Sequence, residues 1–540
     1  MEGKRKTLET VIFLLSLCIL IAIPCFSMPL STKGRWIIDT KTGQRVKLAC
    51  VNWPSHMETM LAEGLHEQPL KRIVALLAKQ KFNCVRLTYA TYMWTRYSNR
   101  TVSESFNFLP EAKEGIAKNN PDLLSKTLPQ AYETVVDELA AQGVMTLLDN
   151  HVSKPTWCCS ETDGNTFFGD TYFDVKEWIQ GLTTVATRFR GKPKVMAIST
   201  RNELRGPLQN QDDWYKYILE GASAIHNANP DVLIFASGLS YANDLTYLKS
   251  KTLGTNFDDK LVYDAHWYPW SWEDVSTWDV ELLNDACYRK TQYFINQTGF
   301  TYALHEEPIP LFMGEFGMDQ RGLSRADDHF LSCFLAFATD IDLDWGMWGW
   351  QGSYYFRENK TNIDETFGAM DHHWNRIRSP QYMSRVDFVK NKLIEPSSKS
   401  PPSFVIFHPQ SGTCVRNNGI KELLTGKCKQ PQRWSYAGDG SPIRLEGSNL
   451  CLQAVGDGHP AILSKNCTSQ KSSWRLLTAT KLHVATVDET GEYLCLQKES
   501  PLTTKVITSK CVVTLSEPDC QRDPLQDPTM QWFKLTSTNV

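Results

Sequence analysis

The sequence predicts an α/β chain in two parts, a (β/α)8 TIM barrel over residues 28–395 and an all-β domain over 404–540. Three observations predict this organisation. Short apolar runs alternate with longer amphipathic segments through the first part. The second part lacks that alternation and repeats one cysteine-pair pattern three times, and a Pro/Ser-rich run separates the two parts.

Eight runs of the first part are almost continuously apolar, as parallel strands buried on both faces are. We expect strands at 46–51, 84–88, 144–149, 195–199, 232–236, 261–265, 310–314 and 345–348, and helices at 69–80, 128–142 and 212–227. In the second helix, Tyr132, Val135, Val136 and Leu139 form one apolar stripe, and Gly143 follows it as a stop. Eight strand–helix alternations favour a closed barrel, with an open doubly wound sheet as the alternative.

Composition excludes some classes of partner. The chain has 57 Lys+Arg against 60 Asp+Glu and a net charge of -3, so nucleic acid is not an expected partner. The 17 Trp, 19 Tyr and 24 Phe would suit sugar rings, but aromatic residues are also common in cores.

The N-terminus has the order of a secretory signal peptide, which we place at residues 1–27. Lys4, Arg5 and Lys6 precede an apolar run at 11–23, and a Pro-Cys-Phe-Ser segment follows. An uncleaved signal anchor is the alternative. No later stretch is long and apolar enough to span a bilayer, so after cleavage we expect a soluble monomer without membrane contact, secreted to the extracellular space or cell wall. Thirteen of the 15 cysteines would remain, and the acceptor triplets at Asn99, Asn296, Asn359 and Asn466 fit the same route.

Residues 396–403 are rich in Pro and Ser and read as a linker. Beyond it, each of three units has a cysteine pair spaced by 14 or 16 residues and then a tryptophan at Trp434, Trp474 or Trp532. The threefold order resembles the ricin-B-type β-trefoil lectins. That resemblance implies the disulfides Cys414–Cys428, Cys451–Cys467 and Cys495–Cys511 and leaves Cys520 unassigned.

The lectin lobes of that family usually carry an Asp two residues after the first cysteine. Here those positions are Arg416, Gln453 and Gln497, none of which is a carboxylate. This departure puts galactose binding in doubt for all three lobes.

Two acids follow predicted barrel strands, where barrel enzymes place their catalytic groups. Asn202-Glu203 follows the strand at 195–199, and Glu315 lies between Gly314 and Gly317 after the strand at 310–314. Either acid alone is more simply a surface ion-pair partner or helix cap. Together they are the two carboxyl groups that glycosidic bond cleavage needs, one protonated and one ionised.

An ordered set of residues extends this pattern. Arg86, His151, Asn202-Glu203, His266, Tyr268, Glu315 and the Trp348-Gly-Trp350 run occur in the order used by glycoside hydrolase family 5, the cellulase family, which this chain resembles over most of residues 30–395. The resemblance, together with the C-terminal repeats, is to plant proteins with a ricin-B-type tail. It implies a retaining mechanism in which Glu203 is the acid/base and Glu315 the nucleophile.

The other residues of the set are expected to bind substrate or to support the two acids. Arg86 and Tyr268 can hydrogen-bond Glu315, and Arg86 can keep it ionised. Asn202, His151 and His266 can hold sugar hydroxyls. Strand alternation points Trp348 and Trp350 the same way, so only depth in the barrel separates them, and we choose Trp350 as the residue that stacks under the sugar.

The remaining motifs are less specific. About half of Trp53, Trp94, Trp157, Trp267, Trp270 and Trp272 are expected to touch substrate. Cys158 and Cys159 are expected to bond another loop, with a vicinal bridge or a metal site as the less favoured alternatives. No zinc spacing or phosphate cradle occurs, so no metal or cofactor is expected.

The leading hypothesis is therefore a secreted β-glycosidase acting on a β-glucan, mannan or related glycan. A non-hydrolytic carbohydrate-binding protein and a transglycosylase using the same carboxylates are the alternatives.

Overall fold

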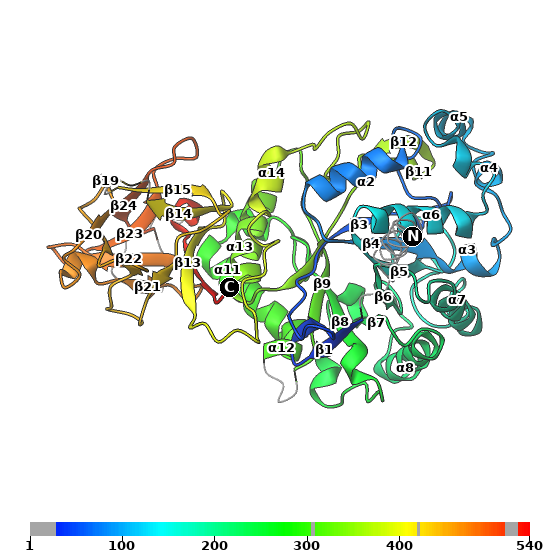
Figure 1. Cartoon of the computed structure of the whole chain (residues 1–540), viewed down its shortest axis with the longest axis horizontal. Helices are drawn as coiled ribbons and strands as arrows, with labels where there is room; N and C mark the ends of the chain where they lie inside the picture. The colour runs from blue at the N-terminus through cyan, green and yellow to red at the C-terminus, as the bar shows by residue number, and fades with distance from the viewer. Residues whose placement is uncertain (1–28, 304–307, 418, 420–421, 513–526) are drawn as a thin grey trace, which may run out of the picture.

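The computed structural model describes residues 29–303, 308–417, 419, 422–512 and 527–540 (Figure 1). The predicted signal peptide and Cys520 lie outside the described residues. Within the described ranges, no helix combines the length and the apolar character that crossing a membrane requires.

A closed barrel of eight parallel strands forms the centre of the first part (Figure 1). Its neighbours follow the chain order from β3 to β9, and β10 closes the ring against β3. The strands are β3 (Ala49–Trp53), β4 (Cys84–Ala90), β5 (Met145–Val152), β6 (Val195–Ser199), β7 (Leu233–Ser237), β8 (Leu261–His266), β9 (Leu311–Phe316) and β10 (Asp344–Met347). The closed ring confirms the (β/α)8 prediction over the open sheet.

The strands are buried along their whole length, which is why they read as apolar runs in the sequence. The start of β3 lies three residues later than predicted, at Ala49 rather than at 46. The residues before it are used differently, because Arg45 and Lys47 form buried ion pairs with Asp342 below the barrel.

Helices surround the barrel, and their buried faces pack on it. The predicted helices correspond to α2 (Leu70–Lys79), α6 (Leu128–Ala141) and α8 (Gln211–Ala228). In α6 the predicted stripe is buried, a capping box at Thr127 starts the helix, and Gly143 follows its end with φ +80°. The other longer helices are α5 (Pro110–Asn119), α7 (Val175–Arg188), α11 (Leu283–Phe294) and α13 (Arg325–Asp340), and the short ones are α3 (Thr91–Thr95), α4 (Val102–Ser105), α9 (Leu239–Ala242), α10 (Thr277–Val280), α12 (Phe300–Ala303) and α14 (Pro380–Arg385).

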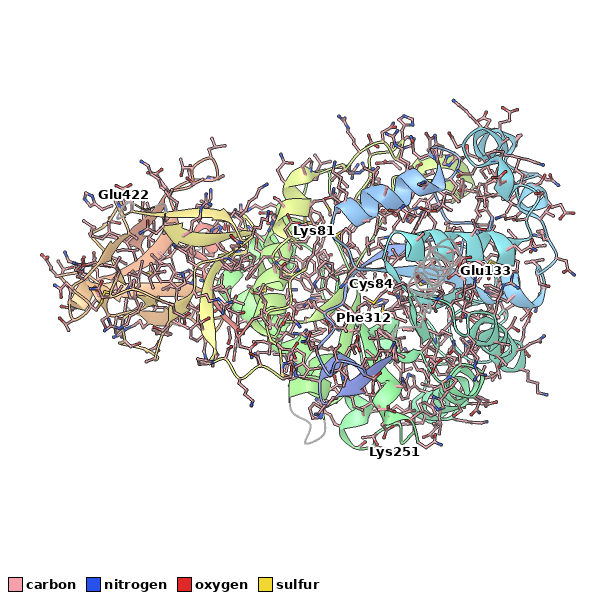
Figure 2. All side chains as sticks on the ribbon, viewed as in Figure 1. Lys81, Cys84, Glu133, Lys251, Phe312 and Glu422 are labelled. Atoms are coloured by element: carbon pink, nitrogen blue, oxygen red, sulfur yellow. A yellow bond between two sulfur atoms is a disulfide. The ribbon has the colours of Figure 1, made fainter. Side chains whose placement is uncertain are left out.

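Side chains divide sharply between the inside and the outside of the molecule. Figure 2 shows Cys84 and Phe312 near the middle of the barrel, Lys251 at the edge of the first part and Glu422 at the edge of the C-terminal part. The first two are fully buried, and the last two are exposed. Two small antiparallel hairpins complete this part, β1 (Leu30–Lys33) with β2 (Trp36–Asp39) and β11 (Ser353–Arg357) with β12 (Lys360–Asp364).

The C-terminal part is built from antiparallel strands in two sheets. The strands are β13 (Ser403–His408), β14 (Thr413–Asn417), β15 (Leu423–Lys427), β16 (Trp434–Ser435), β17 (Arg444–Leu445), β18 (Cys451–Gln453), β19 (His459–Pro460), β20 (Ile462–Ser464), β21 (Arg475–Leu477), β22 (His483–Val487), β23 (Tyr493–Lys498), β24 (Val506–Lys510) and β25 (Lys534–Thr538). All three repeat tryptophans are fully buried, and the three cysteine pairs are the disulfides Cys414–Cys428, Cys451–Cys467 and Cys495–Cys511.

The two parts share a continuous hydrophobic cluster. Phe388 of the first part packs against Phe407 of β13 with ring centroids 4.7 Å apart, and the Trp532 indole donates to Asn284 Oδ1 at 2.8 Å. Lys534 of β25 pairs with Asp340 at 2.8 Å. Residues 396–402 form neither helix nor strand, but Glu395 just before them is buried and accepts from the backbone N–H of Arg45. The C-terminal part is therefore packed against α11 and α13 rather than only tethered (Figure 1).

Candidate active site

The carboxyl ends of the barrel strands bring the two predicted acids together. Glu203 comes four residues after the end of β6, and Glu315 lies near the end of β9. One carboxylate oxygen of each, and a ring nitrogen of His266 at the end of β8, lie within 4.8 Å of one another. Side chains separated by more than a hundred residues in sequence therefore face one cleft.

Glu315 is held at both of its oxygens. Arg86 Nη1 donates to Oε1 at 2.8 Å, and the Tyr268 hydroxyl donates to Oε2 at 3.0 Å. Burial raises the pKa of Glu315 to about 7, while the His266 and Arg86 cations act in the opposite direction. Arg86 thus makes the expected contact, but the burial of Glu315 outweighs its effect on the pKa.

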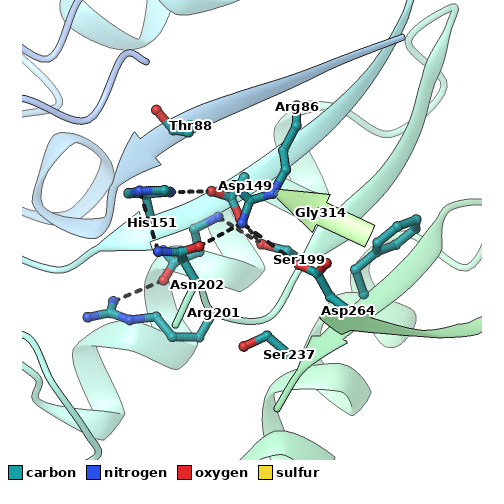
Figure 3. Close-up of polar contacts among 12 residues, drawn as sticks. Arg86, Thr88, Asp149, His151, Ser199, Arg201, Asn202, Ser237, Asp264 and Gly314 are labelled. Carbon is teal, nitrogen blue, oxygen red and sulfur yellow. Dashed lines mark hydrogen bonds and ion pairs between the residues drawn. The ribbon is translucent and has the colours of Figure 1, made fainter. Parts of the chain in front are cut away.

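Arg86 is fully buried and connects several elements of the site (Figure 3). Its guanidinium donates to Asn52 Oδ1 at 2.9 Å and to Asn202 Oδ1 at 2.7 Å, and it lies 3.0 Å from Asp149 Oδ1. Burial alone would lower the pKa of Arg86, but Asp149, Glu315 and Asp264 raise it above its usual value. The guanidinium is therefore a permanent cation at the base of the cleft.

Glu203 is oriented by His266. His266 Nδ1 lies 2.8 Å from Glu203 Oε1. Although burial acts to lower the pKa of His266, the Glu315 carboxylate and hydrogen bonds to Asp264 and Glu203 raise it to about 10. At neutral pH the ring is thus a cation that donates to Glu203. Glu203 itself has φ +28°, a backbone region that non-glycine residues rarely occupy and that is typical of constrained functional positions.

His151 has a different charge state. Its Nδ1 lies 2.7 Å from Asp149 Oδ2, and its Nε2 lies 3.4 Å from the Asn202 amide (Figure 3). Burial, followed by repulsion from Arg86, holds the pKa of His151 well below its usual range. The neutral ring donates to Asp149 and presents a lone pair toward Asn202.

The polar residues beneath this layer were not predicted from the sequence. Asp149 holds Arg86 and His151 and accepts from the Ser199 hydroxyl at 2.5 Å, and the Asn52 amide donates to the Gly314 carbonyl at 2.9 Å. Asp149 could have been found, because it precedes His151 by two residues on the same strand and so shares its face. Position 314 requires glycine, because a Cβ there would lie 2.1 Å from Asp264 Oδ1.

The cleft above the acids has a volume of about 740 Å³. Of the six uncertain tryptophans, Trp157, Trp270 and Trp272 line it, whereas Trp53, Trp94 and Trp267 are buried. This division agrees with the expectation that about half of them would lie in the cleft.

The choice of Trp350 as the stacking residue is wrong. Trp348 lines the cleft beside His151, whereas Trp350 is fully buried and packs against Phe82 with centroids 6.2 Å apart. The choice rested on strand alternation, but β10 ends at Met347, so the alternation does not extend to these residues.

The expectation for Cys158 and Cys159 is also wrong, because they bond each other. The remaining described cysteines of the first part pair as Cys50–Cys84 and Cys287–Cys333. The spacing of Cys158 and Cys159 did not favour this bond, because adjacent Cα atoms lie closer together than those of most disulfides.

The clustered side chains include metal-ligating residue types, and they are engaged with one another. Glu203, His266 and Glu315 offer oxygen and nitrogen atoms at close range, with His266 beside Glu203 and with Arg86 and Tyr268 donating to Glu315. Cys158 and Cys159 also lie near Glu203, but as a disulfide they supply no thiolate. What the arrangement can do is transfer a proton at Glu203 and present a carboxylate at Glu315.

Comparisons with known proteins agree with this geometry. The family model described as Cellulase (glycosyl hydrolase family 5) matches residues 41–353. The chain is 40% identical over 540 residues to a glycosyl hydrolase 5 family protein of Chamaecyparis obtusa, with 97% of this chain and 95% of that protein covered. It is 21% identical over 342 residues to an endoglucanase of Paenibacillus polymyxa, with 59% of this chain and 78% of that protein covered.

Solved structures share the barrel. An endocellulase from the archaeon Pyrococcus horikoshii superposes with a TM-score of 0.55 at 18% identity, over 68% of this chain and 100% of that chain. The catalytic domain of the major endoglucanase of Xanthomonas campestris gives a TM-score of 0.55 at 20% identity, over 67% of this chain and 99% of that chain. With the family match covering most of the barrel and both acids in one cleft, the chain belongs to glycosyl hydrolase family 5, the cellulase family, and is a glycoside hydrolase.

Proposed function

We propose that this protein cleaves β-glycosidic bonds with retention of configuration, using Glu203 as acid/base and Glu315 as nucleophile. The observation that carries the proposal is the approach of the two carboxylates to within 4.8 Å across one cleft, each with its own hydrogen-bond donors. Retaining enzymes have carboxyl groups roughly 5 Å apart, whereas inverting enzymes need about 6.5–9.5 Å to admit a water. The short separation favours direct attack by Glu315.

In the first step, Glu315 attacks the anomeric carbon while Glu203 gives its proton to the departing oxygen. Arg86 and Tyr268 fix the two oxygens of Glu315 at 2.8 and 3.0 Å, so the attacking atom is already oriented when the sugar binds. The bond from the anomeric carbon to the leaving oxygen breaks as the bond to the Glu315 oxygen forms. The product of this step is a glycosyl-enzyme ester.

In the second step, Glu203 takes a proton from water, and the resulting hydroxide displaces Glu315 from the anomeric carbon. His266 Nδ1, 2.8 Å from Glu203 Oε1, orients the carboxylate that acts as base. Asn202 lies between Arg86 and His151, where its amide can bond the sugar 2-hydroxyl.

The substrate is proposed to be a β-glucan, with mannans as the related class to be tested. The cleft is lined by Trp157, Trp270, Trp272 and Trp348, whose faces suit the apolar faces of sugar rings. The Pyrococcus horikoshii endocellulase has been crystallised with cellotetraose. A panel of β-glucans, mannans and aryl glycosides would identify the glycan, and product analysis would separate transfer to water from transfer to a second sugar.

The mechanism is tested by trapping the intermediate. A 2-deoxy-2-fluoro glycoside with an activated leaving group is expected to label Glu315, as found by mass spectrometry of the digested protein. Glu315→Gln should abolish turnover and labelling while changing glycan affinity little, and Glu203→Gln should still be labelled. Label on any other residue, or an inverted product by NMR, would exclude the mechanism.

The C-terminal part is proposed to be a ricin-B-type β-trefoil that has lost galactose binding. The threefold disulfide pattern and three buried tryptophans support the relationship. At one of the lobe positions without Asp, the Gln497 side chain accepts from Gln531 at 2.9 Å and is engaged within the lobe. Glycan-array binding by Glu315→Gln protein, where the barrel is inactive, tests this, and galactose binding would refute it.

Secretion is proposed from the predicted signal peptide and the six disulfides of the described residues. Asn99, Asn296, Asn359 and Asn466 are all exposed, as glycosylated asparagines must be. Expression in a eukaryotic secretory host should give a monomeric protein in the medium with a new N-terminus near residue 28 and with a mass that falls on enzymatic deglycosylation. Retention of the protein in the membrane fraction would favour the signal anchor.

A further inference from the structure

The Cys158–Cys159 disulfide lies in the cleft beside the acid/base. The two Sγ atoms and a Glu203 carboxylate oxygen lie within 4.8 Å of one another, and the Asn202 amide nitrogen is 3.6 Å from Cys158 Sγ and 3.8 Å from Cys159 Sγ. Both cysteines are partly exposed and line the cleft. A disulfide therefore forms part of the surface that a substrate would meet next to Glu203.

The loop that carries this disulfide is fixed by the two arginines that flank Asn202-Glu203 in the sequence. Arg201 donates to the Asn165 carbonyl at 2.9 Å and to the Ser153 hydroxyl at 3.0 Å. Arg205 donates to the Ser160 carbonyl at 2.9 Å and pairs with Asp163. The segment that supplies Glu203 thus also determines where the disulfide lies relative to it.

The apolar surface continues past the disulfide. Trp157 lines the same cleft, and the Arg357 guanidinium lies 4.9 Å from its ring centroid. Trp157 and the disulfide together form a wall that begins at Glu203 and that we call the 157–159 wall. Sulfur is polarisable and accepts only weak hydrogen bonds, so this wall suits the C–H face of a sugar ring rather than its hydroxyls.

Chemistry decides which sugar ring meets this wall. The acid/base must contact the oxygen of the bond that breaks, so the ring bearing that oxygen as leaving group lies beside Glu203. The anomeric carbon must lie next to Glu315, on the side of the cleft where Glu315, His266 and Glu203 are within 4.8 Å of one another. We propose that the Cys158–Cys159 disulfide binds the leaving-group sugar, serving as a specificity determinant for that side of the cleft; this inference rests on the proposed role of Glu203.

The test compares two substrates that form the same glycosyl-enzyme. The leaving group of β-cellobiosyl fluoride is a single atom, which cannot touch the 157–159 wall, whereas the leaving group of cellotetraose is a sugar. Cys158→Ser/Cys159→Ser in the full chain is expected to lower kcat/KM on cellotetraose about tenfold, the effect of losing a small apolar contact, and on the fluoride less than twofold. The fluoride activity also shows that the variant is folded.

A second measurement uses the trapped enzyme. After fluorosugar labelling, the double variant should recover activity in water at the wild-type rate, because water needs no contact with the wall. Reactivation by added cellobiose, which must occupy the leaving-group side, should need about ten times more cellobiose than in wild type.

Glu161→Gln is the control variant, because Glu161 is an exposed residue of the same loop and its replacement leaves the disulfide and the Arg205–Asp163 ion pair intact. It should change both substrates less than twofold. An equal loss on both substrates by the double variant, no loss on either, a selective loss in Glu161→Gln, or wild-type activity on the fluoride without activity on cellotetraose would each overturn the inference. Failure of wild type to hydrolyse the fluoride at all would overturn the proposed function with it, so the two failures are distinguishable.

Discussion

Replacing Arg86 by Met removes the cation of the site while keeping a side chain of similar length. Arg86 is fully buried, 2.8 Å from Glu315, 3.0 Å from Asp149 and 3.8 Å from Asp264. Breaking a buried ion pair from one side strands the partner charge, which typically costs about 3–5 kcal/mol. We expect Arg86→Met to lose that much free energy of unfolding at pH 8.5.

The loss should depend on pH with a definite sign. Burial already raises the pKa of Glu315 to about 7 in the wild type, and removing Arg86 raises it further. Below pH 7 the Glu315 carboxyl is largely protonated in both proteins, so it contributes little to the difference in free energy of unfolding. As pH rises through 7, ionising this carboxyl costs less free energy in the wild type, where Arg86 is present, than in the variant. The deficit should therefore be larger at pH 8.5 than at pH 5.5.

Guanidinium unfolding at the two pH values measures this. Arg188→Met is the matched control, since Arg188 is partly exposed and pairs with Glu133 at 2.7 Å, and its loss should stay below about 1 kcal/mol. A deficit for Arg86→Met no larger than that of the control, or one that is equal at both pH values, would refute the reasoning.

Four further predictions concern the same cleft. Gly314→Ala places a Cβ 2.1 Å from Asp264 Oδ1. It should lower the free energy of unfolding in urea by about 1–3 kcal/mol and lower kcat/KM more than tenfold. Unchanged activity would contradict the close packing. Trp350→Ala should lose about 3–5 kcal/mol of stability, whereas Trp348→Ala should mainly raise KM; stability and kinetics with the opposite assignment would restore Trp350 as the stacking residue. Activity should rise with pH through about 7, as kcat/KM profiles would show, because burial raises the pKa of Glu315 to that value and only the ionised form attacks. The stabilisation from His266, whose pKa is raised from 6.5 to about 10, should be complete below pH 6.5 and lost as pH rises through 10; thermal unfolding temperatures that do not fall across this range would exclude it.

The barrel was predictable because burial on both faces leaves a direct mark on the sequence. The strand predicted at 195–199 is β6 itself, and the other strands differ from their predictions by a few residues at the ends. The start of β3 could not be placed, because Val46 is apolar although its neighbours Arg45 and Lys47 form ion pairs with Asp342. Apolar character alone does not separate a strand from the residues just outside the barrel.

The two acids were predictable because each follows an apolar run, and Arg86, which lies inside β4, was found through the family resemblance. Glu203 and Glu315 stand out after apolar runs, whereas Asp149 lies inside a strand that reads as structural. Trp348 and Trp350 could not be separated, because the end of β10 at Met347 has no sequence signal. Partners brought together only by folding, such as Asn52 with Gly314, also leave no trace in the spacing.

The packed junction between the two parts has a consequence for truncated forms of this protein. A barrel truncated at the Pro/Ser run would expose Phe388 to solvent. An isolated C-terminal part would expose Phe407 and leave the indole N–H of Trp532 without its acceptor, Asn284. Both fragments would expose hydrophobic surface and tend to aggregate, so recombinant expression should use the two parts in one polypeptide.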